Sequence, residues 1–426
     1  MTLTDAGLVL YGVTWSPARA QHAKHYDLLL SAAMAWTKVE LFSDLVRVTP
    51  DVFAESESGS AVAVLYSGER PVRETKRSLV VEVTPRAAEE SVRDPEFMLR
   101  IEVGEEGLRV LTDHISSIPA FAVLGEVSGL FPFRSAPTDK TFQRLPPSTR
   151  ASITPAGLQK VTERVEGEGS EATTDGLLLA LEEAFSRNVG KRCAVTFSGG
   201  IDSSILLQLA LSSGRKVLAV TVGMPGSHDV ELSKRVARAM GADHVVCELS
   251  DEDVLECSTY LRRTLGIRSP MDAAVGVMFH KAALESAKNG FRQLLAGQGA
   301  DELFGGYMKY LRAFRSGGPR EAVAAMVEDL EGLWRWGLMR DFCSAALAGC
   351  HLTLPYLSSK VISVALPMAL ELKLDGQRRK LVLRGVAREL GLPDEVVEGE
   401  KKAAQYGSRI EKAVRRVLRR TGSPSV

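Results

Sequence analysis

The 426-residue sequence lacks paired cysteines, an excess of charge of either sign and a long apolar run. Its five cysteines are odd in number and form no Cys-x-x-Cys pair, which argues against a secreted disulfide framework and a tetrahedral zinc site. A reducing cytoplasm fits them better. The 53 basic and 53 acidic side chains cancel, whereas dedicated nucleic-acid or membrane-surface binders usually carry a basic excess.

Neither a membrane span nor a signal peptide is expected. The longest uncharged segment, 342–359, contains His351, Thr353 and Pro355, so we interpret it as a buried core segment. The first residues include Asp5 where a signal peptide would be basic. We therefore expect a cytoplasmic protein without a membrane partner.

Residues 1–150 consist of short alternating apolar segments separated by polar turns, which predicts a sheet-rich α+β domain. Strands are expected at 61–66, 78–83, 97–103 and 108–111, with a hairpin turn at 104–107. Several prolines and the run Glu166-Gly-Glu-Gly-Ser170 then indicate an inter-domain linker, which we place at 151–173.

Strands and helices alternate in the third region, 174–426, which predicts an α/β domain with a parallel sheet. The helix that opens this region has Thr174 and Asp175 as its N-cap candidates. The strands and helices that follow are expected at 193–197, 203–211, 217–222, 230–240, 244–249 and 293–296. The remainder is expected to be mostly helical. A basic helix within 401–420 is interpreted first as a solvated helix face and second as a contact for phosphate or RNA.

The segment Ser198-Gly-Gly-Ile-Asp-Ser-Ser204 directly follows a predicted strand and precedes a predicted helix. Adjacent glycines let the backbone approach a ligand closely, and the amides at a helix start attract an anion. Asp202 has no clear place beside a bare phosphate, so we interpret it as a ligand of Mg²⁺, which favours carboxylate and phosphate oxygens. A Walker A loop is excluded because Gly190-Lys191 is followed by Arg192.

This segment resembles the pyrophosphate-binding loop of the N-type ATP pyrophosphatases. A second segment, Leu295-Ala-Gly-Gln-Gly-Ala-Asp-Glu-Leu-Phe-Gly-Gly-Tyr307, resembles the signature of the asparagine synthetase family. Shorter matches follow in the family's order at 340–341, 354–357, 378–384 and 401–402. The resemblance covers about residues 175–410. It implies a HUP-like ATP-pyrophosphatase domain and an AMP-forming ligase that uses ATP and Mg²⁺ to amidate a carboxylate with ammonia or another amine.

The resemblance also implies roles for individual residues. Asp202 and Asp301 would coordinate Mg²⁺, and Lys401 would offset charge on the phosphates. Lys402 is a rival for that role, because Gly399 stands where the family usually has arginine. The implied contacts to the nucleotide and pyrophosphate are Thr196, Ser198, Gly199, Gly200, Asp202, Ser203, Ser204, Val222, Gly223, Ala296 and Gly297.

Three departures from the family pattern matter. Gln298 replaces a glutamate that could act as a base, whereas glutamine can only hydrogen-bond. Proton removal from an amine would then need another group, or none if ammonia enters neutral. His351 and Thr353 replace a glutamate and an arginine, so a carboxylate substrate loses a partner. His351 could compensate, but we interpret it as a structural histidine.

The third departure is Thr2, which stands where glutamine-using members have cysteine. An N-terminal threonine can be a nucleophile activated by its own amine, but the glutamine-holding motifs are absent. We therefore interpret residues 1–150 as a degenerate glutamine amidotransferase domain of the Ntn class that has lost glutaminase chemistry. A separate glutaminase subunit and a second copy of the chain are partners that the resemblance allows.

Three classes of function stay open. An asparagine synthetase-like ligase is the first. A nucleotide-binding regulatory subunit without turnover is the second, motivated by the departures. A tRNA-modifying ATP pyrophosphatase is the third, motivated by the basic C-terminal segment and disfavoured by the zero net charge.

Overall fold

The computed structural model divides into two compact units. Unit 1 comprises Met1–Arg86, Phe97–Val165 and Tyr260–Gly266, and unit 2 comprises Ala87–Glu96, Glu166–Thr259 and Ile267–Val426. The residues that the structure describes are 11–16, 52–55, 61–66, 72–74, 79–83, 99–104, 107–115, 120–123, 128–131, 142–154, 157–162, 172–399 and 407–420.

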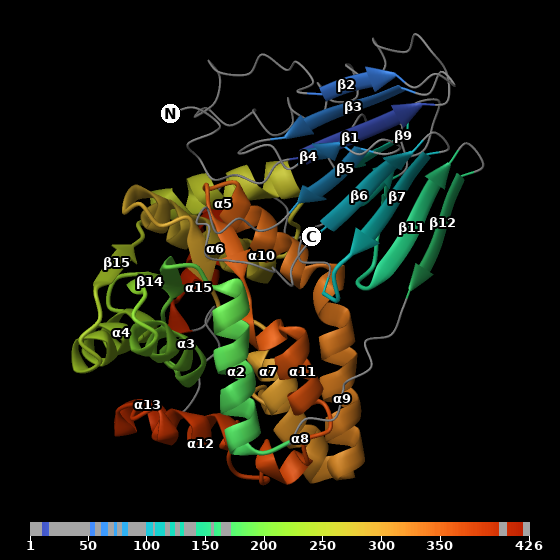
Figure 1. Ribbon diagram of the computed structural model, residues 1–426. Helices are drawn as coiled ribbons and strands as arrows, with labels where there is room; N and C mark the ends of the chain where they lie inside the picture. Colours follow the sequence, from blue (N-terminus) through green and yellow to red (C-terminus); the bar gives the residue numbers. More distant parts are fainter. Residues whose placement is uncertain are drawn as a thin grey trace. The chain divides into compact units, whose positions relative to one another are not determined.

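Unit 1 contains two antiparallel sheets of six strands, in the orders β10-β8-β9-β1-β3-β2 and β12-β11-β7-β6-β5-β4 (Figure 1). The strands are β1 Tyr11–Ser16, β2 Val52–Glu55, β3 Ala61–Tyr66, β4 Val72–Glu74, β5 Leu79–Val83, β6 Leu99–Gly104, β7 Gly107–Thr112, β8 Phe121–Val123, β9 Ser128–Phe131, β10 Phe142–Arg144, β11 Thr149–Thr154 and β12 Gly157–Thr162. The four strands expected from alternation are confirmed as β3, β5, β6 and β7. Gly104 lies opposite Gly107, as a hairpin requires. The Ntn identity of this unit stays a prediction.

Part of the segment expected to be a linker is a hairpin. Strands β11 and β12 pair from Thr149–Thr162 to Thr154–Gly157, and β11 also pairs with β7. Thr149, Ala151 and Ile153 are buried on one face of β11. The prediction of a linker was therefore wrong for 151–162. It gave the nearby prolines and glycines more weight than the alternation of buried and exposed residues, which indicates a strand.

Unit 2 is built on a parallel sheet of five strands in the order β15-β14-β13-β16-β17. The strands are β13 Arg192–Thr196, β14 Lys216–Gly223, β15 His244–Glu248, β16 Gln293–Leu295 and β17 His351–Thr353. Four of them were expected. Strand β14 is buried after its first residue, as is typical of a parallel sheet covered on both faces.

Helices surround this sheet (Figure 1). Their bounds are α2 Thr174–Asn188, α3 Ile201–Ser212, α4 His228–Ala239, α5 Asp251–Leu265, α6 Pro270–Lys288, α7 Ala300–Phe304, α8 Met308–Gly317, α9 Pro319–Gly332, α10 Gly337–Ala346, α11 Ser359–Ala365, α12 Leu381–Glu389, α13 Asp394–Val397 and α15 Ile410–Arg420, with 3₁₀ turns η2 Leu333–Arg335, η3 Pro355–Leu357 and η4 Leu370–Leu372. Helix α2 is capped by Thr173, whose side chain accepts from the Gly176 amide at 3.1 Å, one residue before the expected cap. Helices α3, α4 and α6 pack against β14. No helix in the part of the chain that the structure describes could cross a membrane.

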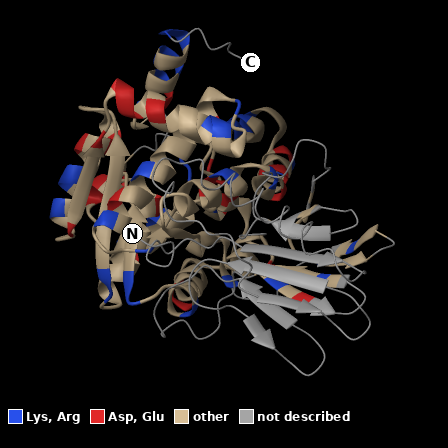
Figure 2. Cartoon of the chain, turned by 90° about the horizontal axis from the view of Figure 1, so that it is seen from above, with Lys and Arg blue, Asp and Glu red and all other residues tan. Residues whose placement is uncertain are grey.

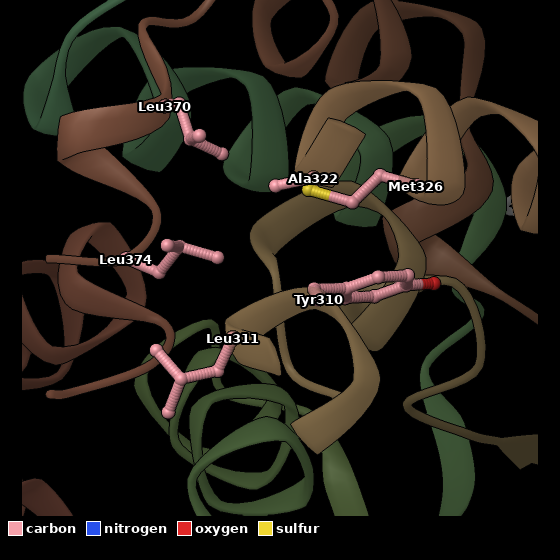
Figure 3. Packing of buried hydrophobic residues seen from close by; sticks show 6 residues of the cluster. All are labelled: Tyr310, Leu311, Ala322, Met326, Leu370 and Leu374. Carbon is pink, nitrogen blue, oxygen red and sulfur yellow. The ribbon is translucent and has the colours of Figure 1, made fainter. Parts of the chain in front are cut away.

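A separate apolar cluster fixes the segment that leads into α12 (Figure 3). It joins α8, α9, η4 and the residue Leu374, and its buried members are Tyr310, Leu311, Ala322, Met326, Leu370 and Leu374. Leu374 also forms a β-bridge with Arg379. The backbone immediately before α12 is therefore held by packing and by hydrogen bonds.

Candidate functional site

A cavity of about 960 Å³ lies in unit 2, where the carboxyl ends of β13, β14 and β16 meet the first turns of α3 and α4. This edge of a parallel sheet is the usual ligand site in open α/β folds. The expected site residues that line it are Thr196, Ser198, Gly199, Gly200, Asp202, Ser203, Val222, Ala296, Gly297, Gln298 and Asp301. Ser204 and Gly223 do not line it, and Ser204 is fully buried. Lys401, its rival Lys402 and Thr2 lie outside the described residues.

The loop after β13 is shaped by its own serines. The Ser198 amide donates to Ser203 Oγ at 3.3 Å, and Ser203 Oγ donates to the Gly200 carbonyl at 3.1 Å. Gly199 has φ +75°, and a Cβ there would lie 2.9 Å from Leu232 Cγ. Gly200 caps α3 without a side chain. The loop therefore presents backbone and hydroxyl groups to the cavity, as an anion site requires.

The two carboxylates expected to bind magnesium converge on one lysine. Lys380 Nζ lies 2.5 and 2.6 Å from the oxygens of Asp202 and 2.7 Å from Asp301 Oδ1. The Lys380 side chain is only 3 % exposed, and each aspartate side chain is 15 % exposed. Sequence reasoning assigned Lys380 no role, although it lies in the basic segment 378–384 that matches the family's order.

Glycines permit this contact. A Cβ on Gly306 would lie 1.8 Å from Asp301 Oδ1 and 2.3 Å from Lys380 Cε, and a Cβ on Gly297 would lie 3.0 Å from Asp202 Cβ. These two glycines of the second motif are thus explained by close approach. Tyr356, also missed as a site residue, donates its hydroxyl to the Asp202 carbonyl at 3.1 Å and anchors the start of α3.

The paired carboxylates fit a magnesium ion. No group of three or more His, Cys, Asp or Glu side chains suited to a metal occurs among the described residues. Mg²⁺ is commonly held by one or two carboxylates together with substrate phosphates and water. Asp202 and Asp301 line the same cavity as the 198–204 loop and provide such a donor set. A bound ion would supply charge neutralisation to phosphate oxygens.

A polar chain of buried residues adjoins Gln298, and one of its members, Arg340, also lines the cavity. Gln298 Nε2 donates to Asp341 Oδ2 at 2.5 Å, and Arg340 Nε donates to Asp341 Oδ1 at 2.7 Å. Arg340 also pairs with Asp272. Complete burial raises the pKa of the Asp341 carboxyl, against the opposing attraction of Arg340 and the hydrogen bond from Gln298. Burial opposes the charge of Arg340, but its two carboxylate partners raise its pKa.

His351 does not contribute to the cavity wall. It lies in β17 with 6 % exposure, and no residue that the structure describes bonds to either ring nitrogen. Burial lowers the pKa of His351 to about 3. Its placement agrees with a structural histidine rather than a partner for a substrate carboxylate.

His351 should make the protein sensitive to acid. In the unfolded chain, His351 has the ordinary histidine pKa near 6.5, so between about pH 6.5 and 3 it is protonated when unfolded but neutral when folded. The free energy of unfolding therefore falls as the pH drops from about 6.5 towards 3. Between pH 6.5 and 4, we expect the free energy of unfolding to fall by about 3 kcal/mol less in His351→Leu than in the wild type. Urea unfolding across this range measures it, with the more exposed His228→Leu as control. An unchanged pH slope in His351→Leu would contradict the assignment.

The basic C-terminal helix is paired within the chain. Arg416 Nε lies 2.8 Å from Asp251 Oδ2, Arg420 lies 3.6 Å from the same carboxylate, and Arg415 pairs with Glu411. Basic and acidic residues are interspersed over the described part of unit 2 (Figure 2). These pairs favour the interpretation as a solvated helix face over an RNA contact.

The part of the chain that forms the candidate site is similar to known proteins. The family model described as Asparagine synthase matches residues 177–348 and 338–425, more than half of the chain. A Methanocaldococcus jannaschii protein named "Putative asparagine synthetase, glutamine-hydrolyzing, 1" is 29% identical over 280 residues, covering 57% of this chain and 51% of that protein. Glutamine-hydrolyzing asparagine synthetase 1 of Arabidopsis thaliana is 26% identical over 234 residues, covering 48% and 38%.

The chain thus spans about half or less of the length of these relatives. Among solved structures, NMN synthetase from Francisella tularensis is similar with 11% identity and a TM-score of 0.29, covering 59% of this chain and 95% of that one. So low a score supports no conclusion about function. The family match, which includes both motifs and Lys380, decides the assignment. The chain belongs to the asparagine synthase family.

Proposed function

We propose that the chain is an ATP-dependent, AMP-forming ligase that joins a carboxylate to ammonia or another amine. The observation that carries the proposal is the convergence of Asp202, Asp301 and Lys380 beside the 198–204 loop, in a cavity large enough for a nucleotide and a second substrate.

The chemistry assigns a task to each group. A carboxylate oxygen attacks the α-phosphorus of ATP, the bond to the β-phosphate oxygen breaks, and pyrophosphate leaves with both bonding electrons. The loop amides and hydroxyls bind the leaving group, and the Lys380 ammonium offsets its charge. The amine then attacks the acyl carbon of the adenylate, and AMP leaves. Asp202 and Asp301 would hold Mg²⁺ on the phosphates.

The identity of the two substrates is a narrower question. We favour a carboxylate other than aspartate, because Thr353 replaces the family arginine and His351 lies outside the cavity wall. The named relatives hydrolyse glutamine according to their names, whereas the glutamine-holding motifs are not found in residues 1–150, so an external supply of ammonia or another amine is our preferred source. A separate glutaminase subunit and a homodimer are compatible with this proposal.

Isotope exchange tests the first half-reaction. With ATP, Mg²⁺ and labelled pyrophosphate, one member of a carboxylate panel should drive exchange into ATP. Asp202→Asn should lower this exchange at least about 100-fold, because it removes a charged group at the reacting phosphates. Asp251→Asn, an arginine-paired aspartate that does not line the cavity, is the matched control.

Two results favour the other functions. ATP binding without exchange for any carboxylate supports the regulatory subunit. Affinity for tRNA that falls steeply with salt supports the tRNA-modifying enzyme. The pairing of Arg415, Arg416 and Arg420 with acidic residues of the chain disfavours the second of these.

A further inference from the structure

Gln298 has a side-chain amide whose nitrogen is held by Asp341 and whose oxygen is not engaged by any residue that the structure describes. Its side chain is part of the cavity wall, and its nitrogen donates to Asp341. No residue that the structure describes donates to the oxygen, Oε1. The preceding residue, Gly297, approaches Asp202 so closely that a Cβ would lie 3.0 Å from the aspartate's own Cβ. Gln298 thus lines the same cavity as Asp202 and directly follows the residue that approaches Asp202 closely.

The orientation of this amide is set by charge. Asp341 is fully buried and accepts from the Arg340 guanidinium at 2.7 Å, and Arg340 is itself held by Asp272. A carboxylate paired in this way is only an acceptor, so Gln298 can face it only with its NH₂ group. The oxygen on the other arm of the same planar amide then points away from Asp341.

We propose that Asp341 is a positioning residue that holds Gln298 as a hydrogen-bond acceptor for the amine nucleophile. This inference rests on the proposed ligase function. An attacking amine must keep its lone pair for the acyl carbon. A protein group can therefore hold it productively only by accepting a hydrogen bond from one of its N–H groups. An NH₂ group in the same place would engage the lone pair instead.

The bonding changes of this step balance as follows. The nitrogen lone pair forms the new C–N bond, the bond from the acyl carbon to the AMP oxygen breaks, and AMP leaves with the electron pair. The excess proton on nitrogen passes to water, because a glutamine carbonyl does not take it. The site therefore suits a neutral amine, either ammonia or a primary amine.

Asp341→Asn should reverse the amide of Gln298. Arg340 will take the oxygen of the new asparagine, so its NH₂ group will face Gln298 and draw the Gln298 oxygen away from the cavity. Hydroxylamine is the amine probe, used with the carboxylate that gives the strongest pyrophosphate exchange. We expect the ratio of hydroxamate formation to exchange to fall about tenfold at low hydroxylamine, through a higher KM for the amine.

A second substitution should rescue the first. In Gln298→Glu/Asp341→Asn, the carboxylate can accept from the asparagine with one oxygen and face the cavity with the other. The ratio should return to within about threefold of the wild type, whereas a merely structural role for Asp341 predicts no rescue. Asp251→Asn, the matched control, should leave the ratio unchanged. An unchanged ratio in Asp341→Asn, or no rescue in the double variant, would overturn the proposal.

A readout without activity separates this inference from the ligase proposal. Neutron diffraction from deuterium-exchanged crystals of the wild-type protein locates the two deuterons of the Gln298 amide. Deuterons on the atom that faces Asp341 support the inference, and deuterons on the atom that faces the cavity overturn it. Absence of exchange with every carboxylate would instead reject the ligase function, whatever the amide orientation.

Discussion

Lys380→Met is expected to lower pyrophosphate exchange strongly and to destabilise unit 2. The substitution removes an ammonium that lies 2.5 to 2.7 Å from carboxylate oxygens of both Asp202 and Asp301. Both largely buried carboxylates then lose their ion pair with Lys380, and breaking a buried ion pair typically costs about 3–5 kcal/mol. Because the aspartates keep some exposure, we expect about 3 kcal/mol. Loss of the charge that, in the proposed mechanism, offsets the leaving pyrophosphate should lower exchange about 1000-fold.

Two further variants separate stability from chemistry. Asp202→Asn added to Lys380→Met removes one of the repelling charges, so it should recover part of the lost stability but none of the exchange. Lys281→Met is the matched control, since Lys281 pairs with Asp253 at 3.0 Å and does not line the cavity. Chemical denaturation and exchange rates measure both effects. Substantial exchange in a folded Lys380→Met variant would remove Lys380 from the proposed mechanism.

The parallel sheet could be predicted because its strands are short, apolar and followed by helices. The same reasoning missed β17, because three residues that include His351 and Thr353 carry no recognisable period. It also missed the hairpin at 149–162, where prolines and glycines outweighed a clear alternation. The hydrophobic pattern of the sequence thus identifies helices and strands that are long enough to show a periodicity. It fails for short strands that form only because they pair with distant segments.

Some residues of the candidate site could be predicted from the sequence, and others could not. The 198–204 and 295–307 segments could be found because their glycines and acids are contiguous in the sequence. Lys380 could not, because its partner Asp202 is 178 positions away and nothing around Lys380 distinguishes it from neighbouring basic residues. Asp341 likewise meets Gln298 across 43 positions. Contacts of this kind depend on the packing of α10 and α12 and are visible only in three dimensions.

Gly306→Ala is expected to disrupt the candidate site, because the added methyl group has no room beside Asp301 and Lys380. The added Cβ would fall 1.8 Å from Asp301 Oδ1 and 2.3 Å from Lys380 Cε, distances that no non-bonded atoms tolerate. The carboxylate and the ammonium must therefore separate. Overpacking of this kind typically costs about 1–3 kcal/mol, and we expect exchange to fall about 100-fold because the displaced groups are those that we propose act on the phosphates and the metal.

Gly332→Ala provides the matched control for this glycine. Gly332 ends α9 with φ −78°, and a Cβ there would meet nothing within 4 Å, so alanine should leave stability unchanged or raise it by less than about 1 kcal/mol. Thermal unfolding and pyrophosphate exchange compare the two variants. If Gly306→Ala retained wild-type exchange while Gly332→Ala behaved as expected, the close approach of Asp301 and Lys380 would have no part in catalysis. The glycine pair after α7 would then require an explanation from folding alone.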